Sequence, residues 1–353
     1  MRLSERLSGW LKGPWGPRTK DAPPSEEGPC THVVMLDGTM SSLTPGQETN
    51  VGLIYRLLHE AGGQNLYYEP GIQWRGWRRA HEVASGVGIN RQIRRAYGFL
   101  AGHYKPGDRI LLIGYSRGAY AVRALAGMID RLGLLRAEAA TPDRIREIYL
   151  YYKEDPTNPA ARSFVARHCH PRAEIEAVCV FDTVRALGNR WPLIWRLAPR
   201  VHAFRSQHLG ATVRFGYHAL ALHETRQAFQ PELWDVPHHR LGEIEQIWFR
   251  GTHGIVGGQL AGDIVARGLS NIPLVWMLEK IVERGARLPG DWQDRFPCNP
   301  DAAPSRGYRG VGRLFLFRRG RQIGHDPSER LHPSVGISAP AQAHVLSTEE
   351  AKV

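Results

Sequence analysis

The sequence lacks most of the features that mark secreted, membrane-spanning and zinc-binding proteins. It has only four cysteines in 353 residues and no Cys-x-x-Cys pair, and the cluster His168-Cys169-His170 has no evident source of further ligands. We therefore expect reduced thiols, no metal and no cofactor. No apolar run approaches the roughly 20 residues needed to cross a bilayer. Charges occupy the N-terminal stretch where a signal peptide needs its apolar segment. The sequence therefore predicts a cytoplasmic protein with neither a signal peptide nor a membrane-spanning segment.

Acidic residues are scarce relative to basic ones. The chain has 34 Asp and Glu against 46 Lys and Arg, a formal net charge of +12. Such a charge favours anionic partners, although an arginine-rich composition spread over a solvated surface explains it equally well. No nucleic-acid recognition motif accompanies it, which argues against a nucleic-acid partner. One helical face near the N-terminus would permit peripheral membrane contact or ordinary packing; it carries Leu3, Leu7, Trp10 and Leu11.

Composition divides the chain into three segments. Residues 1–30 are predicted to be an N-terminal extension and linker, because residues 13–30 are rich in proline, glycine and charge. Residues 31–336 are predicted to form one α/β domain, long enough to bury a sizeable core. Residues 337–353 form a weakly patterned tail.

Within the predicted domain, short apolar runs alternate with segments of helical periodicity. The apolar runs predict strands within residues 31–39, 65–69, 109–114, 176–184, 245–253 and 313–317. The periodic segments predict helices over residues 49–60, 118–132, around 89–100 and around 272–282. Strands that alternate with helices in this way predict a mostly parallel sheet with helices on both faces.

The most distinctive local pattern is GYSRG at residues 114–118. It follows a predicted strand and precedes a helical segment rich in small residues. This is the Gly-x-Ser-x-Gly pattern of a nucleophile elbow, in which a sharp strand-to-helix turn exposes a serine hydroxyl. The start of the helix also supplies positive dipole and free N–H groups to a developing oxyanion. We predict that Ser116 is a nucleophile, with a purely structural turn as the alternative.

A nucleophilic serine needs a histidine as base and a carboxylate to orient it. In α/β hydrolases these follow in the order Ser, acid, His. Asp182 is the next carboxylate at a predicted strand end, where active sites of parallel sheets form, although a turn or helix cap is the alternative. His253 follows a predicted strand and precedes a glycine-rich loop, whereas His218 and His223 are expected in helical or loop settings. We predict that Asp182 and His253 complete the triad.

The oxyanion hole needs a second N–H besides that of Arg117. In this architecture the second donor comes from a loop after an early strand. The sequence LDGT at residues 36–39 fits, because Gly38 permits close approach of the backbone and the N–H of Gly38 or Thr39 could donate. The Asp-Gly dipeptide is also a common turn former, so a simple turn is the alternative.

At these residues the sequence resembles a known family, the α/β-hydrolase domain of the first family of type VI secretion phospholipase effectors (Tle1-like) and their uncharacterised relatives. The matching segments run in family order from about residue 31 to 336. They are LDGT (36–39), TNV (49–51), YKPGDRILLIGYSRGAYAVRALAGMI (104–129), FDTVRALG (181–188), HALALHETRQAFQPELW (218–234), IWFRGTHGIVGG (247–258), LSNIPLVWML (269–278) and LHPSV (331–335). The resemblance implies a bacterial lipolytic serine hydrolase with a triad at Ser116, Asp182 and His253. It also allows export through a type VI apparatus.

The chain departs from the family pattern at three positions. Ile255 stands where the family usually has the aspartate of His-x-Asp-Val-Gly-Gly, and His223 replaces the aspartate of Ala-Leu-Asp-Glu. Ser41 replaces an asparagine that is usual shortly after Asp-Gly-Thr. The loss of two acids near the site could alter substrate choice, pocket electrostatics or activity itself.

These observations predict a lipase-like or phospholipase-like serine hydrolase that cleaves carboxylic esters through an acyl-enzyme. If the substrate is a phospholipid, its phosphate could meet Arg75, Arg78, Arg79 or Arg117. The alternative is a non-catalytic binding protein of α/β-hydrolase fold with a degenerate site.

Overall fold

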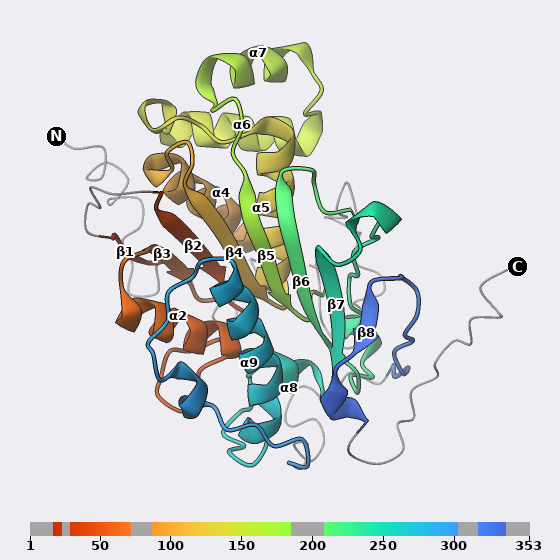
Figure 1. The fold of residues 1–353 in the computed structure, drawn as a ribbon. Coiled ribbons are helices and arrows are strands. Elements are labelled where there is room, and N and C mark those ends of the chain that lie inside the picture. The colour runs from red at the N-terminus through yellow and green to blue at the C-terminus, as the bar shows by residue number, and fades with distance from the viewer. Residues whose placement is uncertain (1–16, 23–28, 72–86, 185–207, 303–316, 337–353) are drawn as a thin grey trace, which may run out of the picture.

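The computed structural model describes residues 17–22, 29–71, 87–184, 208–302 and 317–336. One eight-stranded sheet runs through them in the order β1-β3-β2-β4-β5-β6-β7-β8 (Figure 1). Every neighbouring pair is parallel except β1 and β3. The strands are β1 (Arg18–Lys20), β2 (Thr31–Leu36), β3 (Asn65–Glu69), β4 (Arg109–Tyr115), β5 (Ile175–Phe181), β6 (Val213–Ala221), β7 (Ile244–Phe249) and β8 (Glu329–Leu331).

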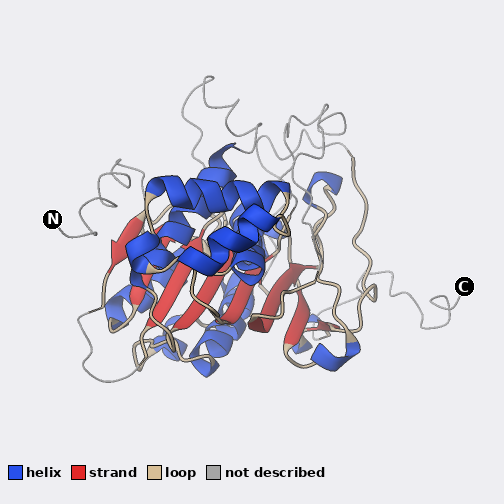
Figure 2. Ribbon diagram, turned by 90° about the horizontal axis from the view of Figure 1, so that it is seen from above, coloured by secondary structure: helices blue, strands red, loops and turns tan. Residues whose placement is uncertain are grey.

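Helices cover both faces of this sheet (Figure 2). The α-helices are α2 (Asn50–Ala61), α4 (Val87–His103), α5 (Arg117–Leu132), α6 (Pro142–Glu154), α7 (Pro159–His168), α8 (His253–Gly257) and α9 (Arg267–Glu283). Helices α2, α8 and α9 pack on one face, and α4 and α5 pack on the other with α6 and α7 behind them. The predicted mostly parallel α/β architecture is therefore confirmed.

The alternation of side chains along β4 explains why the sheet needs helices on both faces. Ile110 and Leu112 belong to the core beneath α4 and α5, whereas Leu111 and Ile113 belong to the core beneath α2 and α9. All four are fully buried. Each such side chain stabilises the fold by roughly 1.5–3 kcal/mol when it leaves water. A strand buried on both faces therefore reads as a continuous apolar run, as predicted.

Most of the predicted elements are found within a few residues of their expected bounds. Helix α2 begins as its capping residue requires, because the Thr49 hydroxyl accepts a hydrogen bond from the Gly52 N–H at 3.0 Å. Within the predicted linker, β1 adds an antiparallel edge strand. The predicted N-terminal helical face and C-terminal tail lie outside the described residues, as does the strand at 313–317 except for its last residue.

The expected setting of His218 was wrong. His218 lies in the middle of β6, between β5 and β7, and is fully buried. A glycine and a polar ring interrupt the apolar pattern of this strand, which hides its β character in the sequence. The buried ring is nevertheless satisfied at one nitrogen, since Nε2 accepts a hydrogen bond from the Thr183 N–H at 3.1 Å. Burial lowers the pKa of His218 to about 3, so the imidazole is neutral.

Candidate active site

Ser116 occupies a strained turn between β4 and α5. Its backbone has φ 58° and ψ −118°, a region that costs a residue with a side chain on the order of 1–3 kcal/mol. The turn is held by main-chain hydrogen bonds from the Ser116 N–H to Phe181 O at 3.0 Å and from the Tyr120 N–H to Ser116 O at 3.2 Å. The strained turn carries the serine to the carboxyl end of the sheet.

The glycines on either side of this turn are required by close backbone contacts. A Cβ on Gly114 would lie 2.7 Å from the Cα of Ala119, and a Cβ on Gly118 would lie 2.0 Å from the carbonyl oxygen of Leu36. Neither backbone neighbour can yield at such distances. The spacing Gly-x-Ser-x-Gly thus reflects how tightly α5 is folded back against β4 and β2.

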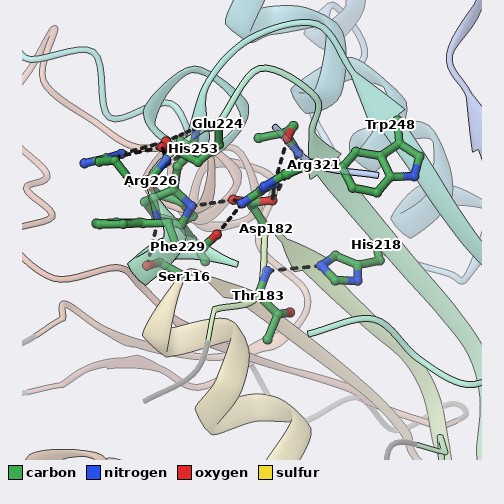
Figure 3. A network of polar contacts seen from close by, with 12 residues as sticks. Ser116, Asp182, Thr183, His218, Glu224, Arg226, Phe229, Trp248, His253 and Arg321 are labelled. Atoms are coloured by element: carbon green, nitrogen blue, oxygen red, sulfur yellow. Dashed lines mark hydrogen bonds and ion pairs between the residues drawn. The ribbon is translucent and has the colours of Figure 1, made fainter. Parts of the chain in front are cut away.

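Three side chains predicted to act together converge at this edge of the sheet (Figure 3). The Oγ of Ser116 lies 2.8 Å from Nε2 of His253, and Nδ1 of His253 lies 2.5 Å from Oδ2 of Asp182. Asp182 directly follows β5, and His253 begins α8 after β7. Ser116 and His253 are 5% and 4% exposed, so both are shielded from bulk water.

The hydrogen-bond chain fixes the tautomer of His253. An ionised carboxylate can only accept, so Nδ1 carries the proton that is donated to Asp182. Nε2 is then left to accept the hydroxyl proton of Ser116. Burial lowers the pKa of His253, while its contacts with Asp182 act in the opposite direction. A neutral imidazole with a free Nε2 lone pair can act as a general base toward the serine.

The predicted oxyanion loop lies beside this serine. The guanidinium of Arg117 donates to the Thr39 hydroxyl, and Gln259 Nε2 donates to Thr39 O at 3.0 Å. The N–H of Gly38 donates to Oδ1 of Asp37 at 2.6 Å and is therefore occupied. Arg117 is the first residue of α5, so its N–H has no helical carbonyl to bond. Arg117 and Thr39 are therefore the candidate N–H donors of the predicted oxyanion hole.

Asp37 anchors the predicted oxyanion loop through the hydrogen bonds of its carboxylate. Besides the Gly38 N–H, its carboxylate accepts hydrogen bonds from the hydroxyl of Thr49 at 2.6 Å and that of Tyr68 at 2.8 Å. Burial raises the pKa of Asp37 to about 6, against the effect of these hydrogen bonds. The sequence indicated Asp37 only as part of a turn, whereas the structure surrounds its carboxylate with neutral donors.

Arg321, which sequence analysis did not single out, pairs with Asp182. Its Nη1 lies 2.6 Å from Oδ1 and its Nη2 lies 2.9 Å from Oδ2. Burial alone would raise the pKa of Asp182, but the charge of Arg321 and the contact with His253 lower it below its usual range. Asp182, the acid of the candidate triad, is therefore ionised, and it accepts hydrogen bonds from both Arg321 and His253.

A second group missed by sequence analysis covers the other side of His253. The main-chain N–H of His253 donates to Oε2 of Glu224 at 3.3 Å, and Glu224 pairs with Arg226 at 2.7 Å. The guanidinium of Arg226 lies 3.7 Å above the ring of Phe229, whose centroid is 5.0 Å from that of His253. Glu224 and Phe229 both lie in the segment quoted above as matching the family, and this was the signal available in the sequence.

The three departures from the family pattern have structural partners. Ile255 is buried and its side chain lies against Gly251, where a Cβ would meet it at 2.6 Å. Nδ1 of His223 accepts a hydrogen bond from the Gly251 N–H at 3.1 Å, and Oγ of Ser41 accepts one from the Gly71 N–H at 3.1 Å. Ile255 thus fills space with apolar atoms, while the other two maintain loop geometry.

The described residues contain no group of three or more His, Cys, Asp or Glu side chains that could hold a metal ion. All four cysteines are among the residues described, and each is a free thiol. No helix in the described ranges is both long and apolar enough to cross a bilayer. Arg75, Arg78 and Arg79, named above as phosphate contacts, lie outside the described residues.

Comparison with known proteins finds a family model that matches most of the chain. The family model described as the catalytic domain of T6SS Tle1-like phospholipase effectors matches residues 31–280. An uncharacterized protein of Saccharomyces cerevisiae is 36% identical over 120 residues, which cover 29% of this chain and 18% of the yeast protein. The family match confirms the α/β-hydrolase-like fold.

Two solved structures are distant neighbours. An uncharacterized protein from Pseudomonas aeruginosa is 15% identical with a TM-score of 0.42, covering 81% of this chain and 52% of its own. The Tle1 effector bound to the VgrG spike of the type VI secretion system is 17% identical with a TM-score of 0.26, covering 68% of this chain and 52% of its own. The chain therefore spans about half the length of these solved chains.

Proposed function

Because the chain belongs to the family of Tle1-like type VI secretion phospholipase effector catalytic domains, which indicates a lipid hydrolase, we propose that it is a serine hydrolase of carboxylic esters in lipids or phospholipids. The observation that carries this proposal is the hydrogen-bonded chain from Ser116 through His253 to Asp182. We propose residues 31–336 as the catalytic domain, since β8 continues the sheet beyond the residues that the family model matches.

The proposed mechanism is acyl transfer through the serine. Oγ of Ser116 attacks the ester carbonyl carbon while Nε2 of His253 accepts the hydroxyl proton. Asp182 holds the imidazole by accepting from Nδ1, and the N–H groups of Arg117 and Thr39 stabilise the tetrahedral oxyanion. His253 then donates the proton to the leaving alcohol. Water, activated by the same imidazole, hydrolyses the acyl-enzyme and releases the acid.

An exposed apolar loop supports a lipid as the substrate. Ile264 and Val265 are 83% and 68% exposed in the loop that follows α8, which is unusual for two adjacent aliphatic side chains. The loop is linked to the oxyanion loop through the hydrogen bond from Gln259 to Thr39. We propose that these side chains make peripheral contact with a lipid surface. Export through a type VI apparatus and a cytoplasmic location before export are parts of the same proposal.

The second candidate function is a non-catalytic binding protein. Ile255 and His223, which replace family acids beside the site, favour this alternative. A fluorophosphonate probe distinguishes the two, because it labels only a serine that a neighbouring base activates. Labelling of native protein that disappears in Ser116→Ala supports the enzyme, and an unlabelled native protein supports the binding protein.

The decisive experiment measures hydrolysis of phospholipid vesicles, monoglycerides and p-nitrophenyl esters by wild type and by Ser116→Ala. We expect the substitution to lower kcat by at least about 10³-fold, because no nucleophile remains. Ser42→Ala is the matched control and should retain full activity, because among the described residues the Ser42 hydroxyl bonds Thr44. Thermal unfolding monitors the fold of each variant. Equal rates for wild type and Ser116→Ala would rule out the proposed mechanism.

A further inference from the structure

We propose that Arg321 is a positioning residue of the triad, which locks the Asp182 carboxylate in place and keeps His253 in its neutral, proton-accepting form. This inference rests on the proposed hydrolase function. It concerns a residue outside the segment that the family model matches, which ends at residue 280.

The geometry leaves the Asp182 carboxylate no freedom to rotate. Oδ1 accepts from Nη1 of Arg321 at 2.6 Å and from the Ala221 N–H at 3.0 Å. Oδ2 accepts from Nη2 of Arg321 at 2.9 Å and from Nδ1 of His253 at 2.5 Å. Each oxygen therefore has two donors. Rotation of the Asp182 carboxylate about its Cβ–Cγ bond would break both hydrogen bonds to the guanidinium of Arg321 at once.

Arg321 is itself held from two other elements. Nη1 also donates to Ala221 O at 2.7 Å, and Nη2 also donates to Phe229 O at 2.5 Å. The side chains of Arg321 and Asp182 are 1% and 0% exposed. The fork thus connects the end of β6, the turn below His253 and the catalytic acid (Figure 3). A lysine ammonium carries the same charge but has no planar fork with which to make these four bonds.

The charge balance gives Arg321 a second effect. Without a guanidinium, Asp182 and neutral His253 would carry one buried negative charge, and protonation of the pair would neutralise it. With Arg321 present, the charges of the three side chains sum to zero, so the same protonation leaves a net positive charge in a buried site. Arg321 therefore lowers the apparent pKa at which the His253–Asp182 pair takes up a proton.

The other groups around His253 do not supply this effect. Glu224 and Arg226 face it from the loop after β6, where they form an ion pair and influence the pKa of His253 in opposite directions. From β4, the hydroxyl of Tyr115 donates to His253 O at 3.2 Å and is neutral, since burial raises its pKa. Arg321 is thus the cation bonded directly to the acid of the pair.

Two substitutions separate charge from geometry. In Arg321→Gln both are lost, so we expect kcat to fall and the acid limb of the kcat/KM profile to move up by about one to three pH units. In Arg321→Lys the charge is retained but the fork is lost. We expect kcat to fall while the acid limb stays within about half a unit of wild type.

The matched control is Arg240→Gln. Arg240 is also mostly buried and also donates to main-chain oxygens, with Nη2 bonding Val213 O at 2.5 Å and Arg214 O at 2.9 Å. Val213 and Arg214 begin β6, at the end opposite to the site. We expect this variant to lose stability without a shift in the acid limb. An unmoved acid limb in Arg321→Gln, or equal shifts in the Lys and Gln variants, would overturn the inference.

A titration that needs no substrate makes the test independent of the proposed function. The proton on Nδ1 of His253 should give a low-field ¹H NMR resonance whose shift follows protonation of the pair. We expect it to titrate at lower pH in wild type and Arg321→Lys than in Arg321→Gln. If Ser116→Ala leaves ester hydrolysis unchanged, the proposed function fails while this titration still decides the role of Arg321. Should the Gln variant not fold, wild type against the Lys variant keeps the test: loss of kcat without a titration shift supports the inference, and full kcat overturns it.

Discussion

Two buried aspartates flank the strand that carries Ser116, and they differ in what surrounds them. Asp37 follows β2 and Asp182 follows β5, on either side of β4, and both are almost wholly removed from water. Burial raises the pKa of Asp37 to about 6, although hydrogen bonds from neutral donors oppose it. The pKa of Asp182 falls below its usual range despite the same burial, because Arg321 and His253 contact it.

The comparison shows that the charge of the partners decides what a buried carboxylate can do. Neutral hydroxyl and N–H donors suffice to hold Asp37 as a support for the oxyanion loop. An acid that must stay ionised beside a proton-accepting imidazole needs a fixed cation instead. Under the proposed mechanism, Asp37 would thus position the oxyanion donors and Asp182 would orient the base.

The largest effect is expected for Asp182→Asn. An amide donates as well as accepts, so it can favour the wrong tautomer of His253, and we expect kcat to fall by about 10⁴-fold. The matched variant Asp37→Asn acts on the proposed oxyanion loop, through the bond that Asp37 accepts from the Gly38 N–H, and should lower kcat by no more than about 10²-fold. Both are measured as kcat on a soluble ester. Equal losses in the two variants would contradict the division of roles.

A smaller effect is expected on the pH dependence of stability. The pKa of Asp37 is higher in the folded protein, about 6, than its ordinary value of 3.8, so the folded state binds more protons between these values. The contribution of Asp37 to stability is complete below about pH 4 and falls by about 3 kcal/mol as the pH rises past 6. Asp37→Asn removes this titration, and urea unfolding across the range should show a flatter curve. Asp182 behaves in the opposite sense, since its contribution is lost only as the pH falls below about 4.

Parallel stability curves for wild type and Asp37→Asn would show that Asp37 does not titrate in the folded protein over this range. That result would remove the contrast between the two carboxylates.

The smallest effect is expected for Tyr68→Phe, which removes one of the neutral donors to Asp37. We expect a loss of about 1 kcal/mol in unfolding free energy and a change in kcat of less than about 10-fold. Tyr55→Phe, in a ring that packs 4.8 Å from that of Tyr68, controls for loss of a hydroxyl elsewhere in the same cluster. A larger loss of kcat in Tyr68→Phe than in Asp37→Asn would mean that Tyr68 has a role of its own.

Local sequence signals were sufficient for most of the architecture. Continuous apolar runs predicted β2, β4, β5 and β7, and the glycines around Ser116 predicted the tight turn that the structure contains. The nomination of Asp182 and His253 relied on a simple rule, that parallel strands bring their carboxyl ends to one edge. The structure brings these side chains together, and their catalytic roles stay predictions.

Arg321 could not be found in this way. It lies 139 residues from Asp182 in a chain where arginine is abundant, and its own segment shows no strand or helix pattern. Main-chain hydrogen bonds bring that segment to the site, from the Arg319 N–H to Thr225 O at 2.8 Å and from the Gln227 N–H to Phe317 O at 3.1 Å. The sequence also failed to predict β6. Gly216 and His218 interrupt the apolar run in this strand, and such runs were the signal that predicted the neighbouring strands.

The place of β8 bears on where this protein can be divided. A shortened chain that stops at residue 280 would retain all three proposed catalytic side chains and still satisfy the family match. It would also leave a carboxylate in the interior without its counter-charge and turn β7 into a bare sheet edge that invites self-association. We therefore expect the functional boundary of the domain to be set by the ion pair between Arg321 and Asp182, which lies beyond residue 280, where the family model ends.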